Sequence, residues 1–145
     1  MTVTKPVSKD DYLLNEQVGF LLRVAMQRHT AIFMSRIRHG LTQTQFAALA
    51  KLHEVGPCSQ NHLGRLIYLD AATTKGVVDR LKARHFVTVR ADTSDRRRRA
   101  IALTDAGRTV AEVAIKVAKR ITRHTLAPLT AAEQRTVIRL LKKLA

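Results

Sequence analysis

The segment 93–104 reads TSDRRRRAIALT, so that Asp95 is followed directly by Arg96, Arg97, Arg98 and Arg99. A guanidinium group stays charged in proteins and donates in a planar fork that fits phosphate oxygens. Ile101 and Leu103 then alternate with alanine, which is the pattern of a half-buried strand. A solvated charge run would not need such a strand. The segment therefore favours binding of a polyanion by arginines held on an ordered element.

A second group of residues suited to DNA lies on a helix expected after Asp70. Its buried stripe would be Thr74, Val77, Val78 and Leu81, at spacings i, i+3, i+4 and i+7. The opposite face presents small and charged side chains, namely Ala72, Lys75, Gly76, Asp79, Arg80 and Ala83, with Thr73 at its flank. Thr73 can donate to a phosphate or a base edge, Ala72 can contact a thymine methyl group, and Lys75 can reach guanine or a phosphate. The alternative is a solvated helix face with ordinary charges.

The whole chain carries the same charge signal. Its 145 residues include 26 Lys and Arg against 11 Asp and Glu, a formal net charge of +15. Hydrophobic residues make up 46%, which is typical of one globular domain rather than of a disordered chain. Only 4% are aromatic and none is Trp, so the stacking residues typical of single-strand and RNA binders are scarce. These numbers favour double-stranded DNA as the partner, with RNA second.

Other classes of protein fit less well. Cys58 is the one cysteine, so no internal disulfide can form, and no group of Cys and His residues has the spacing of metal ligands. There is no nucleophile–base pair or phosphate-binding glycine loop, so we expect neither an enzyme nor a cofactor. The N-terminus lacks a signal-peptide pattern, and no stretch approaches the roughly 18 apolar residues of a membrane helix. We expect a cytoplasmic protein without a membrane partner.

The first two elements can be placed from periodicity and capping. Apolar residues at intervals of three and four predict one long amphipathic helix from Tyr12 to about Ile37. Thr42 with Gln45 forms a capping box, which predicts a second helix that ends near Gly56-Pro57.

Caps and periodicity also place the remaining elements of the chain. Ser59 and Asp70 can cap two short helices that are close enough in sequence to form a helix-turn-helix. Period-two alternation then predicts a hairpin with its tip at 92–98. Thr104 caps a further helix, and a capping box at Thr130 opens the last one.

This order of elements predicts a mainly α (α+β) fold, in which a winged helix-turn-helix over 42–103 is flanked by long terminal helices over 10–37 and 104–145. A helix in the major groove leaves the neighbouring hairpin close to the phosphate backbone and the adjacent minor groove. Arginine is attracted there by the concentrated negative potential. The four arginines would lie at the tip of this wing.

The stretch LDAATTKGVVDRLKARHFVTVRADTSDRRRRAIALTDAGR, residues 69–108, resembles the signature of the MarR family of bacterial transcription regulators. The matching features are Asp79-Arg80-Leu81, Arg90, Asp95-Arg96-Arg97, and Leu103-Thr104 followed by Gly107. The spacing between Asp-Arg-Arg and Leu-Thr is the one that the family uses. The order of the flanking helices agrees as well, so the resemblance covers nearly the whole chain.

The resemblance implies a homodimer in which the terminal helices intertwine, so that two winged domains read a pseudo-palindromic operator. It assigns Arg97 to the minor groove and Asp95 to orienting it, while Arg96, Arg98 and Arg99 would contact phosphates. The terminal helices also carry many apolar residues, among them Leu13, Leu14, Phe20, Leu140, Leu141 and Leu144. These residues would either form the dimer interface or close a monomeric core.

Two positions depart from the family pattern. Gly76 stands where a larger polar residue is common and costs about 1 kcal/mol inside a helix. We expect it to allow close packing or close approach of DNA. His85 stands where the family usually has Gly, at a position expected to need a positive φ.

The resemblance also implies repression relieved by a small, often aromatic ligand, bound between the dimerisation helices and the DNA-binding domain. The candidate ligand residues are Arg23, His29 and His53, since each is a polar residue that can face this region. The alternative for either histidine is an ordinary core position. A basic, imidazole-lined pocket would suit an aromatic carboxylate such as a benzoate, a hydroxycinnamate or a pyridine carboxylate.

Three functions remain to be compared. The favoured one is a sequence-specific repressor released by its ligand, and the alternative is an architectural protein that coats DNA through charge alone. An operator preferred by orders of magnitude over random duplex would separate them. A redox sensor is disfavoured because Cys58 lies in the loop before the helix-turn-helix and has no second cysteine to resolve it.

Overall fold

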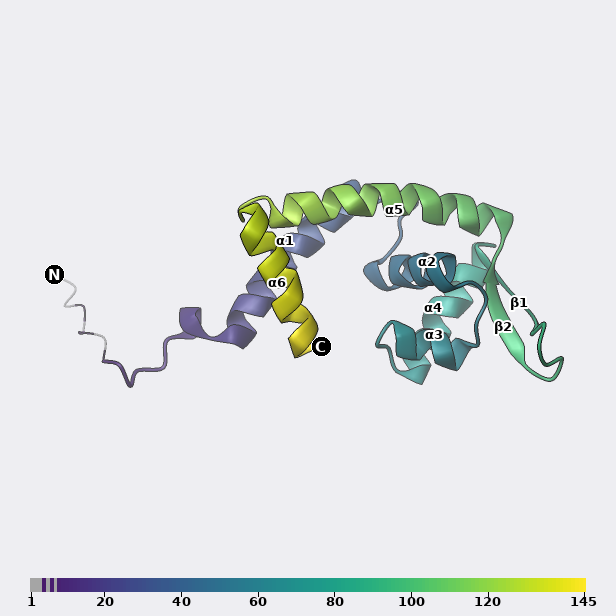
Figure 1. Ribbon diagram of the computed structural model, residues 1–145, viewed down its shortest axis with the longest axis horizontal. Helices are drawn as coiled ribbons and strands as arrows, with labels where there is room; N and C mark the ends of the chain where they lie inside the picture. Colours follow the sequence, from purple (N-terminus) through teal and green to yellow (C-terminus); the bar gives the residue numbers. More distant parts are fainter. Residues whose placement is uncertain (1–3, 5, 7) are drawn as a thin grey trace.

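The computed structural model describes residues 4, 6 and 8–145. Its elements, in chain order, are the short 3-10 helix η1 (Leu14–Glu16), α1 (Val18–Arg36), α2 (Gln43–Val55), α3 (Gln60–Leu66), α4 (Ala71–Ala83), β1 (Val87–Ala91), β2 (Arg99–Leu103), α5 (Asp105–Leu126) and α6 (Ala131–Leu144). Helix α5 runs along the molecule, with α1 and α6 at one end and α2, α3, α4 and the hairpin at the other (Figure 1). The mainly helical winged helix-turn-helix fold is confirmed.

The first helix differs from the prediction in two ways. It begins at Val18 instead of Tyr12, because the backbone is extended at Leu13 and Gln17, on either side of η1. Gln17 gives α1 no side-chain cap. The helix is also not clearly amphipathic within one chain. Among its residues only Phe33 is buried, whereas many of its apolar side chains are exposed, including Val18, Leu21, Leu22, Val24, Met26 and Met34.

The expected DNA-binding unit, residues 42–103, is built by the predicted caps. The Thr42–Gln45 capping box opens α2, and the Ser59 hydroxyl accepts from His62 N–H at the start of α3. The α3–α4 pair packs closely at Gly64, where a Cβ would lie 2.7 Å from Thr74 Oγ1. The core of this unit contains residues of α2, α3, α4, both strands and α5, with Leu49, Leu63 and Leu81 fully buried.

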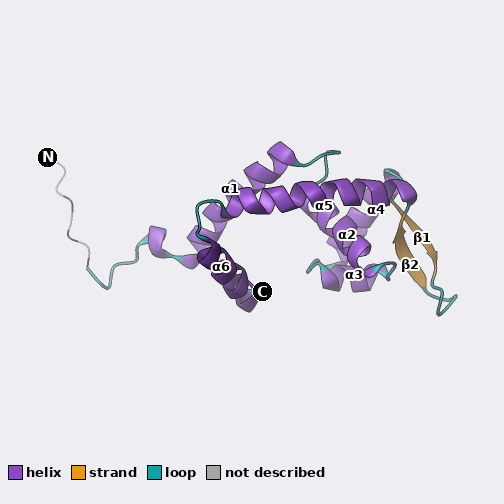
Figure 2. Cartoon of the chain, turned by 45° about the horizontal axis from the view of Figure 1, so that its top comes forward, coloured by secondary structure: helices purple, strands orange, loops and turns teal. Residues whose placement is uncertain are grey.

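The wing is an antiparallel hairpin in which Val89 pairs with Ile101 (Figure 2). Cys58 pairs with Ile101 from the other side, through Cys58 N–H to Ile101 O (3.2 Å) and Ile101 N–H to Cys58 O (2.7 Å). The loop before the helix-turn-helix thus fixes one edge of the wing. The tip lies between the two strands at 92–98, as predicted.

Helix α5 joins the two ends of the molecule. Its first half packs on the DNA-binding core through Val110, Ala111 and Ala114. Its second half forms a separate small core with α1, in which Phe33, Val117 and Ile121 are buried. The Phe33 ring lies 6.1 Å from that of Phe46 in α2, so this small core reaches the DNA-binding unit.

The apolar residues expected in a dimer interface do not close a core in the single chain. Leu13, Leu14, Leu140, Leu141 and Leu144 are all exposed, the last by 69%. Phe20 is half-buried and lies under the Arg23 guanidinium, with Cζ 5.3 Å from the ring centroid. No helix of the described part is both long and apolar enough to cross a membrane.

Candidate DNA interface and effector groove

Helix α4 presents the face that the sequence predicts. Thr74, Val77, Val78 and Leu81 are buried, while Ala72, Thr73, Lys75 and Arg80 are exposed. The Asp70 carboxylate caps the helix by accepting from Thr73 N–H at 2.7 Å. This hydrogen bond lowers the pKa of Asp70. The cap fixes the first turn of α4. This turn carries Ala72 and Thr73, at the N-terminal end of the helix, which is expected to enter the major groove of DNA.

Lys75 is held in an exposed pair within α4. Its Nζ lies 2.7 Å from Asp79 Oδ2, and this contact lowers the pKa of Asp79. Exposed ion pairs of this kind contribute little to stability, because water screens them. Lys75 can therefore exchange Asp79 for a phosphate or a base at small cost.

Gly76 does not serve close packing within the chain. A Cβ at this position would meet only Arg80 Nη1, at 3.4 Å, which is a flexible side-chain end. Of the two explanations that the sequence leaves open, packing inside the chain is excluded. Close approach of DNA stays a prediction.

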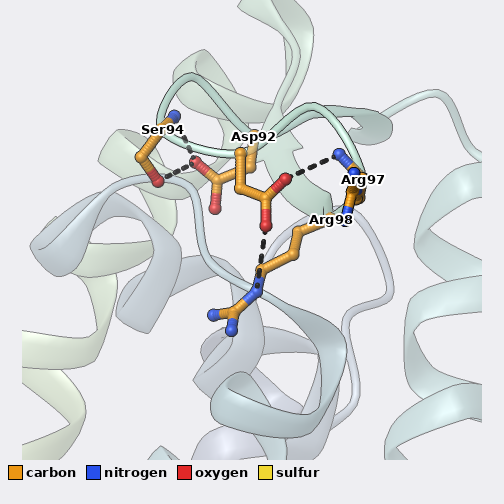
Figure 3. Close-up of polar contacts among 5 residues, drawn as sticks. Asp92, Ser94, Arg97 and Arg98 are labelled. Carbon is orange, nitrogen blue, oxygen red and sulfur yellow. Dashed lines mark hydrogen bonds and ion pairs between the residues drawn. The ribbon is translucent and has the colours of Figure 1, made fainter.

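The wing tip is ordered by its own carboxylates (Figure 3). Asp92 accepts from the backbone N–H and the hydroxyl of Ser94, both at 2.9 Å, and these bonds lower the pKa of Asp92. Asp95 accepts from Arg97 N–H at 3.0 Å, and its other oxygen lies 3.8 Å from Arg98 Nε. By accepting backbone N–H groups, the two carboxylates give the tip a defined backbone.

The pairing of Asp95 differs from what the resemblance implies. Its carboxylate contacts the Arg97 backbone and the Arg98 side chain, and within the described residues it makes no ion pair with the Arg97 guanidinium. The reason is local: the turn directs the Arg97 N–H at the carboxylate and places the guanidinium of the next residue beside it. Arg96, Arg97, Arg98 and Arg99 are all exposed.

A groove lies between α1 and the start of α2, next to the small core of Phe33, Val117 and Ile121. Its volume is about 480 Å³. We call it the α1–α2 groove, and it is lined by Thr30, Phe33, Met34, Ile37, Gly40, Leu41, Thr42, Gln43 and Thr44. Thr30 Oγ1 accepts from Gln43 Nε2 at 2.9 Å across it. The groove therefore has an apolar wall from α1 and a polar end at the first turn of α2.

A second hollow on α1 continues from this groove. Its lining includes Arg23, and it shares Thr30 and Met34 with the α1–α2 groove. Of the three predicted ligand residues, Arg23 is the one that lines either of these two hollows in the described part of the chain.

The two candidate histidines face α5 instead. His29 Nδ1 lies 2.8 Å from Thr125 Oγ1, and His53 Nε2 lies 3.5 Å from Glu112 Oε1. Neither histidine is among the residues that line the groove or its continuation. Both are only half-buried, and their role in ligand binding stays a prediction.

Sequence reasoning missed the residues that line the groove. Their signal was present at Thr42, whose capping box marks the positive end of a helix next to the apolar end of α1. It also missed Arg84, whose guanidinium donates to the backbone carbonyl of His39, 45 residues away. In the described residues no cluster of three or more His, Cys, Asp or Glu is placed to hold a metal ion.

Taken together, a recognition helix, a basic wing and long flanking helices define a winged-helix DNA-binding regulator. The family model described as MarR family matches residues 41–98. The transcriptional repressor NicR of Pseudomonas putida is 39% identical over 140 residues, which cover 96% of this chain and 89% of NicR. The chain belongs to the MarR family.

Two solved structures extend the likeness to the fold. A probable transcriptional regulator of Pseudomonas aeruginosa has 49% identity and a TM-score of 0.86, with 92% of this chain and 100% of that one covered. BpsR of Bordetella bronchiseptica has 41% identity and a TM-score of 0.86, with 92% and 96% covered, and its DNA binding is regulated by 6-hydroxynicotinic acid. This chain is therefore a transcription regulator and not an enzyme. Membership of this family also favours a regulator over a protein that coats DNA through charge alone.

Proposed function

We propose that the protein is a dimeric repressor that binds a pseudo-palindromic operator and is released from it by a small aromatic carboxylate. The observation that carries the proposal is the α1–α2 groove, which lies between the terminal helices and the DNA-binding unit in a chain 41% identical to an acid-regulated relative.

The dimer is supported by the exposed apolar residues of η1, α1 and α6. Exposed apolar surface of this kind is unusual on a monomer and is typical of an interface. A symmetric pair of winged domains would then read two half-sites related by a two-fold axis.

DNA contact is supported by the exposed face of α4 and the exposed arginines of the wing tip. We assign Ala72, Thr73, Lys75 and Arg80 to the major groove, because small and basic side chains on the exposed face of a helix fit base edges and phosphates. Arg97 is assigned to the minor groove, and Arg96, Arg98 and Arg99 to phosphates, with Asp95 ordering the tip.

The effector class follows from the chemistry of the groove. Phe33, Met34 and Ile37 offer apolar and aromatic surface to a flat ring. The first turn of α2 carries hydroxyl groups and the positive end of a helix, which suits a carboxylate. Arg23 supplies a second positive charge beyond Met34. These features suit any flat aromatic acid. Because BpsR, at 41% identity, is regulated by 6-hydroxynicotinic acid, we favour a pyridine carboxylate of that kind over a benzoate or a hydroxycinnamate.

The operator can be found by selecting bound duplexes from a random pool at physiological salt. The proposal expects an enriched motif with two-fold symmetry and one dimer bound per motif. Analytical ultracentrifugation of the protein alone, and of its complex with the enriched duplex, gives the stoichiometry. An asymmetric motif bound by one chain would contradict the dimeric arrangement.

Binding of the acid in the α1–α2 groove can be tested by a substitution that narrows the groove. Thr44→Trp places a bulky side chain at the polar end of the groove, on a half-buried position of α2. We expect it to weaken binding of 6-hydroxynicotinate at least tenfold in calorimetry and to leave operator affinity within about threefold. Lys116→Trp, on the exposed surface of α5, is the matched control. Unchanged acid binding in Thr44→Trp would place the effector elsewhere.

A further inference from the structure

We propose that Arg84 couples the α1–α2 groove to the recognition helix, so that filling the groove changes operator affinity through this side chain. The inference rests on the proposed function, because it takes an effector in that groove as its starting point. It adds the residue that carries the regulation.

Arg84 joins the end of α4 and the start of the wing to a loop that is distant in sequence. It is the C-terminal cap residue of α4. Its Nη2 donates to the backbone carbonyl of His39, in the loop between α1 and α2. Its Cζ lies 4.7 Å from the centroid of the Phe86 ring, directly before β1. One half-buried side chain therefore contacts the loop, the end of α4 and the start of the wing.

The loop that Arg84 holds also forms part of the groove. His39 and Gly40 adopt consecutive left-handed conformations, with φ of 63° and 58°. Gly40, Leu41 and Thr42 follow directly and line the groove. Only Gly40 separates Leu41 from the His39 carbonyl, so a shift of Leu41 on filling the groove would displace that carbonyl through one intervening residue.

The contact between Arg84 and His39 lies where a small displacement would change operator binding. The end of α4 and the start of β1 set the angle between the recognition helix and the wing. Both elements must reach DNA together for the operator to be bound. Since the guanidinium–carbonyl bond is charge-assisted, it transmits a displacement of the carbonyl more firmly than an apolar contact would.

Contacts between two sites do not by themselves show coupling, so the test measures coupling directly. The quantity is the release ratio, defined as the operator dissociation constant at saturating 6-hydroxynicotinate divided by that without it. Coupling of this kind is typically about 5- to 150-fold. Because it is a ratio, any effect of a variant on basal operator affinity cancels.

The informative variant is Arg84→Met. It keeps an apolar stem over Phe86 and removes the hydrogen-bond donor to the His39 carbonyl. Arg84→Lys keeps a charge and a donor. Arg108→Met, on the exposed face of α5, is the control for loss of one arginine. Calorimetry with 6-hydroxynicotinate alone shows that each variant still binds the acid, and circular dichroism shows that each is folded.

We expect the release ratio of Arg84→Met to fall to about 1, so that the acid no longer changes operator affinity, with partial recovery in Arg84→Lys and a wild-type ratio in Arg108→Met. A wild-type ratio in a folded, acid-binding Arg84→Met would overturn the inference and leave the proposed function standing. If neither 6-hydroxynicotinate nor benzoate nor 4-hydroxycinnamate releases the wild-type protein from the operator, both the inference and the proposed function are overturned. If Arg84→Met does not fold, Arg84→Lys decides, because its shorter side chain cannot reproduce the guanidinium contact: a release ratio below that of the wild type supports the inference, and a wild-type ratio overturns it.

Discussion

Gly107, in the first turn of α5, lies directly against the backbone of Phe86. A Cβ at Gly107 would lie 2.7 Å from the Phe86 carbonyl carbon and closer still to its oxygen. Thr104 fastens the same junction, since its hydroxyl accepts from Gly107 N–H at 2.9 Å and donates to the His85 carbonyl at 2.6 Å. The long helix α5 is thereby tied to the segment between the recognition helix and the wing.

We expect Gly107→Ala to destabilise the fold by about 3 kcal/mol, because the backbone at Phe86 cannot move away as a flexible side chain could. The measurement is urea unfolding at fixed protein concentration. Gly19→Ala is the matched control, since a Cβ at Gly19 in α1 would meet nothing within 4 Å. This control should gain up to about 1 kcal/mol from helix propensity. Equal changes in the free energy of unfolding for Gly107→Ala and Gly19→Ala would contradict the close approach of Gly107 to the Phe86 backbone.

We expect His85→Gly to stabilise the protein by about 1 kcal/mol. His85 has φ of 60°, which glycine adopts without the steric cost that a Cβ brings. The positive φ expected at this position is confirmed. Thermal unfolding should show a rise of a few degrees. His124→Gly, in the regular helix α5, should lower the melting temperature instead, and a fall in both variants would contradict the account of strain at His85.

Replacing Arg98 by Ala should reduce the salt dependence of operator binding. Each arginine that neutralises a phosphate contributes about 0.9 to the slope of log K against log salt concentration. We therefore expect the slope to flatten by about one for each Arg98 that contacts DNA. Fluorescence anisotropy between low and physiological salt measures it. Arg123→Ala, at the far end of α5, should leave the slope unchanged, and an unchanged slope in Arg98→Ala would remove Arg98 from the interface.

Acid should destabilise the fold partly through the Asp70 cap. The hydrogen bond from Thr73 N–H lowers the pKa of Asp70 in the folded state. A carboxyl group with a lowered folded pKa stabilises the fold above its unfolded pKa of about 4, and this contribution is lost as the pH falls through the folded value.

Asp70→Ser keeps a capping oxygen that does not titrate in this range. Its urea midpoint should therefore fall less than that of the wild type between pH 7 and pH 3. If the two midpoints fall in parallel, the charged form of Asp70 has no special role in the cap.

Local signals explain why much of the fold could be predicted. The caps at Thr42, Ser59, Asp70, Thr104 and Thr130 each involve a residue three positions later, so the sequence contains the whole interaction. The buried stripe of α4 is likewise a matter of helical spacing. These elements place the wing and the exposed face of α4.

Interactions between distant segments could not be read in this way. The bond from Arg84 to His39 spans 45 residues, and the contact of His29 with Thr125 spans 96. The start of α1 at Val18 was also not predictable from apolar periodicity, because periodicity does not show where the backbone becomes extended, as it does at Leu13 and Gln17. The partner of Asp95 depends on the turn geometry at the wing tip, which residue types alone do not determine.

The central claim is release of the operator by an aromatic acid, and titration of the operator complex tests it most directly. The selected duplex, labelled and bound by the wild-type protein at physiological salt, is titrated with 6-hydroxynicotinate, nicotinate, benzoate and 4-hydroxycinnamate, with acetate as the non-aromatic control. The account predicts that 6-hydroxynicotinate releases the duplex at the lowest concentration and that acetate does not release it. A complex that stays bound at millimolar concentrations of every acid would contradict it.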